Sequence, residues 1–270
     1  ATSVDSRLLA SEIKKLVLKM THLSGASHIG SCFSVLDIVS VLYSSNFDIR
    51  LENWKDNKSN RVILSKGHSI AALYAALATK GFFPIGQLDN YCKNGSMLGG
   101  HPNHLVPGVE LSTGSLGHGL PYATGIALAK KKLGYGGQVF VIMSDGELDE
   151  GTTWESALFA QHNNLCNLTV IVDRNFLQSL ESTESTLSLE PLDEKFRSFN
   201  WEVETIDGHD HIKLINVLSK TQLKPKLIIA ETIKGKGVSF MENEVKWHYK
   251  SPNQEEFEKA LKEIENMDTL

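Results

Sequence analysis

Two polar side chains follow two apolar runs in the middle of the chain. Asp145 comes directly after "QVFVIMS", and Asn175 comes shortly after "LTVIVD". Ligands of an open parallel sheet bind beyond the carboxyl ends of its strands. If these two runs are neighbouring strands, both side chains reach one crevice. A carboxylate, an amide carbonyl and a nearby main-chain carbonyl are hard oxygen ligands, which suit Mg²⁺ or Ca²⁺ far better than zinc.

A magnesium ion held by so few protein groups normally also takes phosphate oxygens. Gly146 would let the backbone approach those phosphates, and the following helix could offer its N-terminal amides. The local chemistry therefore indicates a magnesium-diphosphate site. Spacing alone leaves a second interpretation open, because Asp145 and Asn175 could each form an ordinary turn after a strand.

The elements that must position these groups alternate along the chain. Apolar residues at helical spacing predict a helix over 8–19, and a stretch with glycine and serine at 23–34 is expected to interrupt it. Further helices are expected over 35–47, 69–83, 119–134 and 153–164, and strands over 61–65, 138–144, 167–173, 201–206 and 224–233. Residues 84–113 are rich in glycine, asparagine and proline and are expected to form a loop.

The strands are continuous apolar runs that alternate with helices. This pattern predicts an α/β fold with a parallel sheet and helices on both faces. From Asn243 onward the chain turns polar, with a charged helix over 253–265. We expect residues 1–270 to form a single domain with this polar helical extension at its C-terminus.

Composition narrows the classes of function. The 270 residues carry a net charge of −5, which does not favour a nucleic-acid or anionic-membrane partner. No apolar run approaches the ~18 residues of a membrane helix, and we recognise no secretion signal. Cys32, Cys92 and Cys166 are scattered and form no CxxC pair, which favours a reducing, cytoplasmic setting.

The stretch from Ser144 to Asn175 resembles the thiamine-diphosphate motif, in which Gly-Asp-Gly is followed by roughly thirty residues and an Asn. More narrowly, the chain is similar to the N-terminal part of the transketolase family. Four further stretches occur in the family's order, namely "SHIGS" at 27–31, "RVILSKGHSIAALYA" at 61–75, "GGHPNHLVPGVELSTGSLGHGL" at 99–120 and "IAETIKGKGVSFMENEVKWH" at 229–248. The resemblance thus covers about residues 10 to 250, and it implies the thiamine-diphosphate-binding fold of the diphosphate domain.

The resemblance assigns roles residue by residue. It implies that Asp145, Asn175 and the main-chain carbonyl of Leu177 ligate Mg²⁺, with Ca²⁺ or Mn²⁺ as possible substitutes. The remaining positions that it implies for contact with thiamine diphosphate are His68, Gly114, Ser115, Leu116, Gly146, Glu147 and His248.

Catalytic roles also follow from the resemblance. His68 and His248 match histidines that face the diphosphate and the reacting carbon, and His28 and His101 match histidines of the substrate channel. Imidazoles can donate hydrogen bonds and exchange protons near neutral pH, as the attack on a ketose carbonyl requires. Taken singly, His28 or His68 could instead cap a helix, and His101 could belong to an ordinary loop.

Two acidic positions match a subunit contact. Family members link two active sites there through carboxylates, and the matching residues are Glu150 and Glu155. Other positions depart from the family's pattern. Ser144 replaces the first glycine of the motif, Arg174 stands where a second asparagine is often found, and Ser115 replaces a proline. Because Ser144 has a Cβ atom, its backbone should avoid positive φ. Together the departures suggest a side branch of the family.

In the resembled family, the carboxylate that protonates thiamine lies in a second, pyrimidine-binding domain. No strand-helix alternation follows the polar helix here, so we interpret the chain as the N-terminal subunit of a split transketolase. The expected partner is a separate chain with the pyrimidine-binding and C-terminal domains, in an α₂β₂ assembly. The expected reaction transfers a two-carbon ketol unit from a ketose or ketose phosphate to an aldose.

Two other classes stay open. The chain could belong to another thiamine enzyme, either a deoxyxylulose-phosphate synthase-like protein or the α subunit of a 2-oxo acid dehydrogenase. It could also be a non-catalytic subunit that kept the fold.

We expect Asp145→Ala to abolish metal-dependent cofactor binding while the fold stays intact, because the substitution removes the only carboxylate of the expected ligand set. Calorimetric titration with thiamine diphosphate and Mg²⁺, beside a circular dichroism spectrum, measures both effects. Unchanged binding by the variant would remove Asp145 from the metal site.

Overall fold

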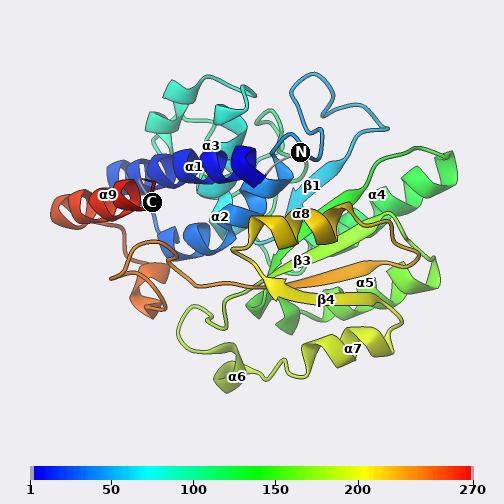
Figure 1. Cartoon of the computed structure of the whole chain (residues 1–270). Coiled ribbons are helices and arrows are strands. Elements are labelled where there is room, and N and C mark those ends of the chain that lie inside the picture. Colours follow the sequence, from blue (N-terminus) through cyan, green and yellow to red (C-terminus); the bar gives the residue numbers. More distant parts are fainter. Residues whose placement is uncertain (1–2, 269–270) are drawn as a thin grey trace.

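A five-stranded parallel sheet organises the computed structural model, which describes residues 3–268 (Figure 1). The strand order is β1-β2-β3-β5-β4, and every neighbouring pair is parallel. The strands are β1 (Arg61–Leu64), β2 (Val139–Ser144), β3 (Leu168–Arg174), β4 (Glu202–Asp207) and β5 (Lys226–Glu231). All five strands expected from the apolar runs are present, and the predicted fold class is confirmed.

Helices cover both faces of the sheet. The α-helices are α1 (Ser3–Ser24), α2 (Ile29–Leu42), α3 (Ile70–Thr79), α4 (Gly119–Leu133), α5 (Gly151–His162), α6 (Thr183–Thr186), α7 (Leu192–Ser198), α8 (His211–Ser219) and α9 (Gln254–Asp268). Short 3₁₀ turns are η1 (Gly67–Ser69), η2 (Ile85–Asn90), η3 (Gly146–Asp149) and η4 (Val245–His248). Within residues 3–268, no helix is long and apolar enough to cross a membrane.

Alternating strand side chains build two separate cores. Phe140 and Ile142 of β2 point into the core formed with α1, α2, α3 and α8. Val141 and Met143 of the same strand point into the opposite core, formed with α4, α5 and α7. The sheet is therefore enclosed on both faces, as continuous apolar strands require.

Helix α2 departs from the expectation. The glycine and serine content of 23–34 predicts an interruption, but α2 begins at Ile29 and all of its residues are buried. The serines are tolerated because their hydroxyls find partners, with Ser34 donating to Asp173 at 2.6 Å and Ser40 to the carbonyl of Leu36 at 2.8 Å. Small side chains allow this helix to pack closely on its neighbours.

The sequence analysis missed helices α7 and α8. The start of α8 carries a local signal, because the carboxylate of Asp210 accepts hydrogen bonds from the amides of Ile212 and Lys213 at 3.0 and 3.1 Å. The expected C-terminal helix is present as α9, and it lies against α1 (Figure 1).

The order of the strands fulfils the geometric condition for a shared crevice. β2 and β3 are adjacent, and Ser144 at the end of β2 pairs with Asp173 near the end of β3. Asp145 and Asn175 therefore leave the sheet side by side at its carboxyl edge.

A buried ion pair ties this edge together. Lys66, just after β1, contacts the carboxylate of Asp173, and both side chains are fully buried. The same carboxylate accepts hydrogen bonds from Ser34 of α2 and from Thr232, which follows β5. One buried anion thus connects the ends of three strands with α2.

We expect Lys66→Met to lower the free energy of unfolding by about 3–5 kcal/mol, because it leaves the Asp173 carboxylate buried without its cation. The matched control is Lys19→Met, which removes a half-exposed pair with Asp89 and should cost under about 1 kcal/mol. Urea denaturation of the two variants measures the difference, and equal losses would contradict the structural role given to the buried pair.

Candidate active site

A cavity of about 240 Å³ opens at the carboxyl edge of the sheet. Its wall comes from the ends of β1, β2, β3 and β5, from the start of α2, and from two loops. The lining residues are His28, Ser31, Lys66, His68, His101, Gly114, Leu116, Ser144, Asp145, Gly146, Asn175, Leu177, Gln178, Ser179, Lys234 and His248. Residues from both halves of the sequence thus meet at one place.

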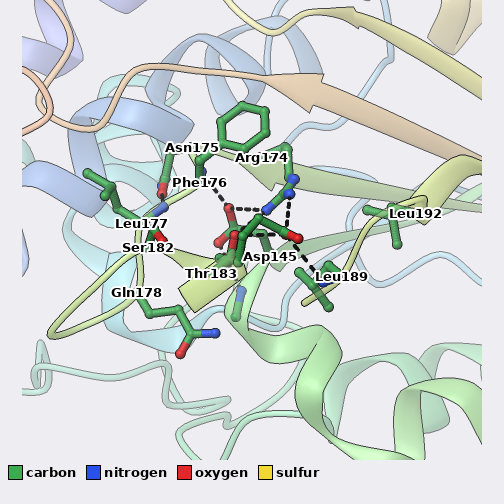
Figure 2. A network of polar contacts seen from close by, with 12 residues as sticks. Asp145, Arg174, Asn175, Phe176, Leu177, Gln178, Ser182, Thr183, Leu189 and Leu192 are labelled. Atoms are coloured by element: carbon green, nitrogen blue, oxygen red, sulfur yellow. Dashed lines mark hydrogen bonds and ion pairs between the residues drawn. The ribbon is translucent and has the colours of Figure 1, made fainter. Parts of the chain in front are cut away.

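Asp145 and Asn175 face this cavity from neighbouring strand ends (Figure 2). Asp145 Oδ1 accepts a hydrogen bond from the amide of Gly146 at 2.8 Å, and Oδ2 accepts one from the amide of Phe176 at 2.7 Å. Asn175 Oδ1 accepts from the amide of Leu177 at 3.0 Å. The turns proposed as the simple alternative therefore exist, but they hold these side chains at the cavity rather than away from it.

The environment of Asp145 disfavours an isolated anion. Burial, and after it the charge of Asp173, raises the pKa of the Asp145 carboxyl to about 6, although Arg174 acts in the opposite direction. A bound divalent cation would stabilise the ionised form of this carboxylate.

The donor chemistry also fits a magnesium-diphosphate group. Within residues 3–268, no three His, Cys, Asp or Glu side chains are grouped to hold a metal, so any ion here needs the mixed oxygen set of a carboxylate, an amide and a main-chain carbonyl. Ser144 Oγ is buried and has no hydrogen-bond partner in that part of the chain, yet the residue lines the cavity. A phosphate oxygen could accept from this hydroxyl.

Four histidines surround the cavity. The ring centroid of His28 lies 4.9 Å from that of His248, 5.3 Å from that of His68 and 6.4 Å from that of His101. Neither His28 nor His68 uses its side chain to cap a helix. His28 stands before α2 with φ of 76°, and its amide donates to the carbonyl of His248 at 2.9 Å. The simple capping role is thus not seen, and the four rings form one cluster.

The buried rings are neutral at neutral pH. Burial, and after it the charge of His101, lowers the pKa of His28 to about 4, and burial together with Lys234 lowers that of His248 to about 3. Burial also lowers the pKa of His68, with Lys66 as the next cause. Lys234 Nζ donates to His248 Nδ1 at 3.1 Å, so the neutral His248 ring carries its proton on Nε2.

Two buried lysines were missed as site residues. Lys66 and Lys234 both line the cavity, and Lys234 Nζ also donates to the carbonyl of Gln178 at 3.2 Å. Burial, and after it Lys66, lowers the pKa of Lys234 to about 8. Each lysine follows a strand end, so the rule that selected Asp145 could have found them. Their charges favour an anionic ligand.

The other expected contacts vary in position. Gly114 and Leu116 line the cavity, whereas Ser115 between them is exposed. Gly146 packs so closely that an added Cβ would lie 3.0 Å from Gln178 Cγ. Glu147 is buried outside the lining and accepts hydrogen bonds from Ser65 and from the amide of Gly117.

Glu150 and Glu155 are exposed near the start of α5, also outside the lining. Their expected role at a subunit contact, like the cofactor contacts of Ser115 and Glu147, stays a prediction. The departure at Ser144 has a clear local basis, because Ser144 is the last residue of β2 and keeps extended backbone.

We expect acid to weaken the fold through the histidine cluster. Since folding lowers the pKa of His28 and His248 below the ordinary 6.5, the stability from their neutral rings is complete above pH 6.5 and is lost as the pH falls toward 4 and 3. His248→Asn should therefore lose less stability between pH 7 and pH 5 than the unsubstituted chain. Urea denaturation at both pH values tests this, with exposed His162→Asn as control; equal pH slopes for His248→Asn and the unsubstituted chain would contradict it.

Comparison with known proteins agrees with this geometry. The family model "Transketolase, thiamine diphosphate binding domain" matches residues 5–268. One of the two subunits of an apulose-4-phosphate transketolase from Phocaeicola vulgatus is 38% identical over 254 residues, which cover 93% of this chain and 90% of that protein. The 6-deoxy-6-sulfo-D-fructose transketolase subunit SqwG of a Clostridium species is 37% identical over 266 residues, which cover 97% of each chain.

A solved structure shows the same fold. The transketolase of Campylobacter jejuni matches with a TM-score of 0.92 at 28% identity, covering 98% of this chain and 43% of that one. The chain therefore belongs to the transketolase family, as the thiamine diphosphate-binding subunit of a split transketolase.

Proposed function

We propose that the cavity at the carboxyl edge holds the diphosphate end of thiamine diphosphate through a divalent ion. Asp145, Asn175 and the main-chain carbonyl of Leu177 would ligate Mg²⁺, or Ca²⁺ or Mn²⁺, which accept the same donors. The observation that carries the proposal is the convergence of this oxygen set with the unpartnered Ser144 hydroxyl and two lysines on one cavity.

The residues around the cavity have separate tasks in this proposal. Lys66 and Lys234 attract the diphosphate, and Gly146 lets it approach the backbone. Bound thiamine diphosphate supplies the nucleophilic carbon for ketol transfer. The neutral rings of His28, His68, His101 and His248 donate hydrogen bonds to substrate oxygens, and the Nε2–H group of His248 is the best defined of these donors.

A second chain completes the enzyme. Two relatives of nearly this length are called subunits of transketolases, whereas the transketolase chain of Campylobacter jejuni is more than twice as long. We propose that the partner supplies the pyrimidine-binding and C-terminal domains in an α₂β₂ assembly, with Glu150 and Glu155 at a subunit contact. Residues 1–270 would then act as one cofactor-binding domain in a reducing, cytoplasmic setting.

The substrates are sugars or sugar phosphates in this proposal. One relative is named for apulose 4-phosphate and another for 6-deoxy-6-sulfo-D-fructose, which both carry an anionic group. A ketose of this kind would give its two-carbon ketol unit to an aldose. Product analysis with a ketose phosphate and with pyruvate separates ketol transfer from synthase or 2-oxo acid dehydrogenase chemistry.

We expect the purified chain to show little ketol transfer by itself, even with thiamine diphosphate and Mg²⁺, because the carboxylate that activates thiamine lies on the partner. Activity should rise by at least about a hundredfold when the partner is added, as expected when a general acid–base group is restored. A coupled assay of aldose consumption measures this, with Asp145→Ala plus partner as the control that stays inactive.

Robust turnover by the lone chain would contradict the two-chain proposal. Cofactor binding without turnover in the presence of the partner would favour the non-catalytic alternative.

A further inference from the structure

Arg174 connects the candidate metal-binding carboxylate to the segment that follows β3. Its guanidinium group is buried, with Nη1 3.4 Å from Asp145 Oδ2 and 2.7 Å from Thr183 Oγ1 (Figure 2). On the other side, Nη2 lies 3.0 Å from Glu184 Oε1 and 2.7 Å from Glu190 Oε1. One side chain therefore touches both the strand end of β2 and two points of the 176–190 segment.

The 176–190 segment builds part of the cavity wall. Leu177, Gln178 and Ser179 line the cavity. The segment then turns back, with the amide of Thr183 donating to the carbonyl of Phe176 at 3.0 Å. The position of this turn therefore decides where the expected ligand carbonyl of Leu177 stands.

Apolar burial holds this segment only weakly. Leu180 is 77% exposed, Leu187 is 58% exposed and Phe176 is 40% exposed. Since hydrophobic stabilisation scales with the apolar area removed from water, these side chains contribute little. The polar contacts of Arg174 are the main links between the middle of the segment and the sheet.

Arginine is suited to this position and lysine is not. The planar guanidinium presents donors on two sides, which lets it reach Asp145 and the two glutamates together. Its flat face also packs on the ring of Phe176, with 4.2 Å from Cζ to the ring centroid. A lysine ammonium could replace the charge but not this geometry.

The charges of the group favour a divalent ion. Arg174 faces three carboxylates, namely Asp145, Glu184 and Glu190. One positive and three negative charges sum to −2, which a bound Mg²⁺ would balance.

We propose that Arg174 is a positioning residue that fixes the 176–190 segment against Asp145, so that the wall of the cofactor cavity is in place before a ligand binds. The inference rests on the cofactor site proposed above. Arg174 itself contacts neither the metal nor the substrate, so its loss should weaken cofactor affinity through a mobile wall.

The test compares four variants of the full chain. Arg174→Met removes all of the contacts, and Arg174→Lys keeps only the charge. The Glu184→Gln/Glu190→Gln double variant loosens the segment from solvent-accessible positions and leaves Arg174 beside Asp145. Arg197→Met is the matched control, because Arg197 lies on α7 and pairs with Asp193, outside the cavity lining.

Two measurements are made on each variant. Hydrogen exchange of peptides from 176–190 in the ligand-free chain reports the order of the segment, and calorimetric titration with thiamine diphosphate and Mg²⁺ reports affinity. For Arg174→Met we expect at least about tenfold faster exchange and an about tenfold higher Kd, equivalent to about 1.4 kcal/mol. The double variant should reproduce the faster exchange, Arg174→Lys should restore little, and Arg197→Met should change neither quantity.

Unchanged exchange in Arg174→Met, or a raised Kd in Arg174→Met combined with unchanged exchange in the double variant, would overturn the proposal. The exchange measurement needs no ligand. A failure of the unsubstituted chain to bind thiamine diphosphate would therefore count against the proposed site, and the role of Arg174 would still be decided.

Discussion

The buried carboxylate of Asp173 is the contact on which the site depends. It lies near the end of the central strand β3 and binds Lys66 after β1, Ser34 of α2 and Thr232 after β5. A buried charge without partners is costly, so these elements must meet at this point for the fold to be stable. The same elements form the wall of the cavity. The fold thereby brings Asp145, His28 and Lys234 together although they are far apart in the sequence.

The electrostatics of the cavity follow from this arrangement. Its lysines are held by buried contacts, and their charges help to keep the neighbouring imidazoles neutral. A neutral ring can donate one hydrogen bond and accept another, which is what proton exchange with a substrate hydroxyl requires. Asp145 lies under the opposite constraint, because burial and Asp173 disfavour its charge. A divalent ion with a diphosphate would complement both the carboxylate and the lysines, so the two halves of the site suit one ligand.

Much of this arrangement could be predicted from local patterns, and part of it could not. Apolar runs located all five strands, and the rule for strand ends found Asp145 and Asn175. The same rule was not applied to Lys66 and Lys234, which were therefore missed. The start of α2 at Ile29 could not be predicted from periodicity, because its serines are buried by tertiary partners such as Asp173. Glu147 shows the limit of assignment by position, since its carboxylate holds Ser65 and the amide of Gly117 rather than lining the cavity. Arg174 looked like a simple departure from a family pattern, and its contacts with Glu184 and Glu190 emerge only once the chain is folded.

The central claim is that a divalent ion and the diphosphate of thiamine dock between the ends of β2 and β3. The most direct measurement is a crystal structure of the chain with thiamine diphosphate and Mn²⁺, in which anomalous scattering locates the ion. The account predicts one anomalous peak within about 2.0–2.5 Å of oxygen atoms of Asp145, Asn175 and Leu177, with the diphosphate beside it. A peak at another place, or a diphosphate bound outside the cavity, would contradict it.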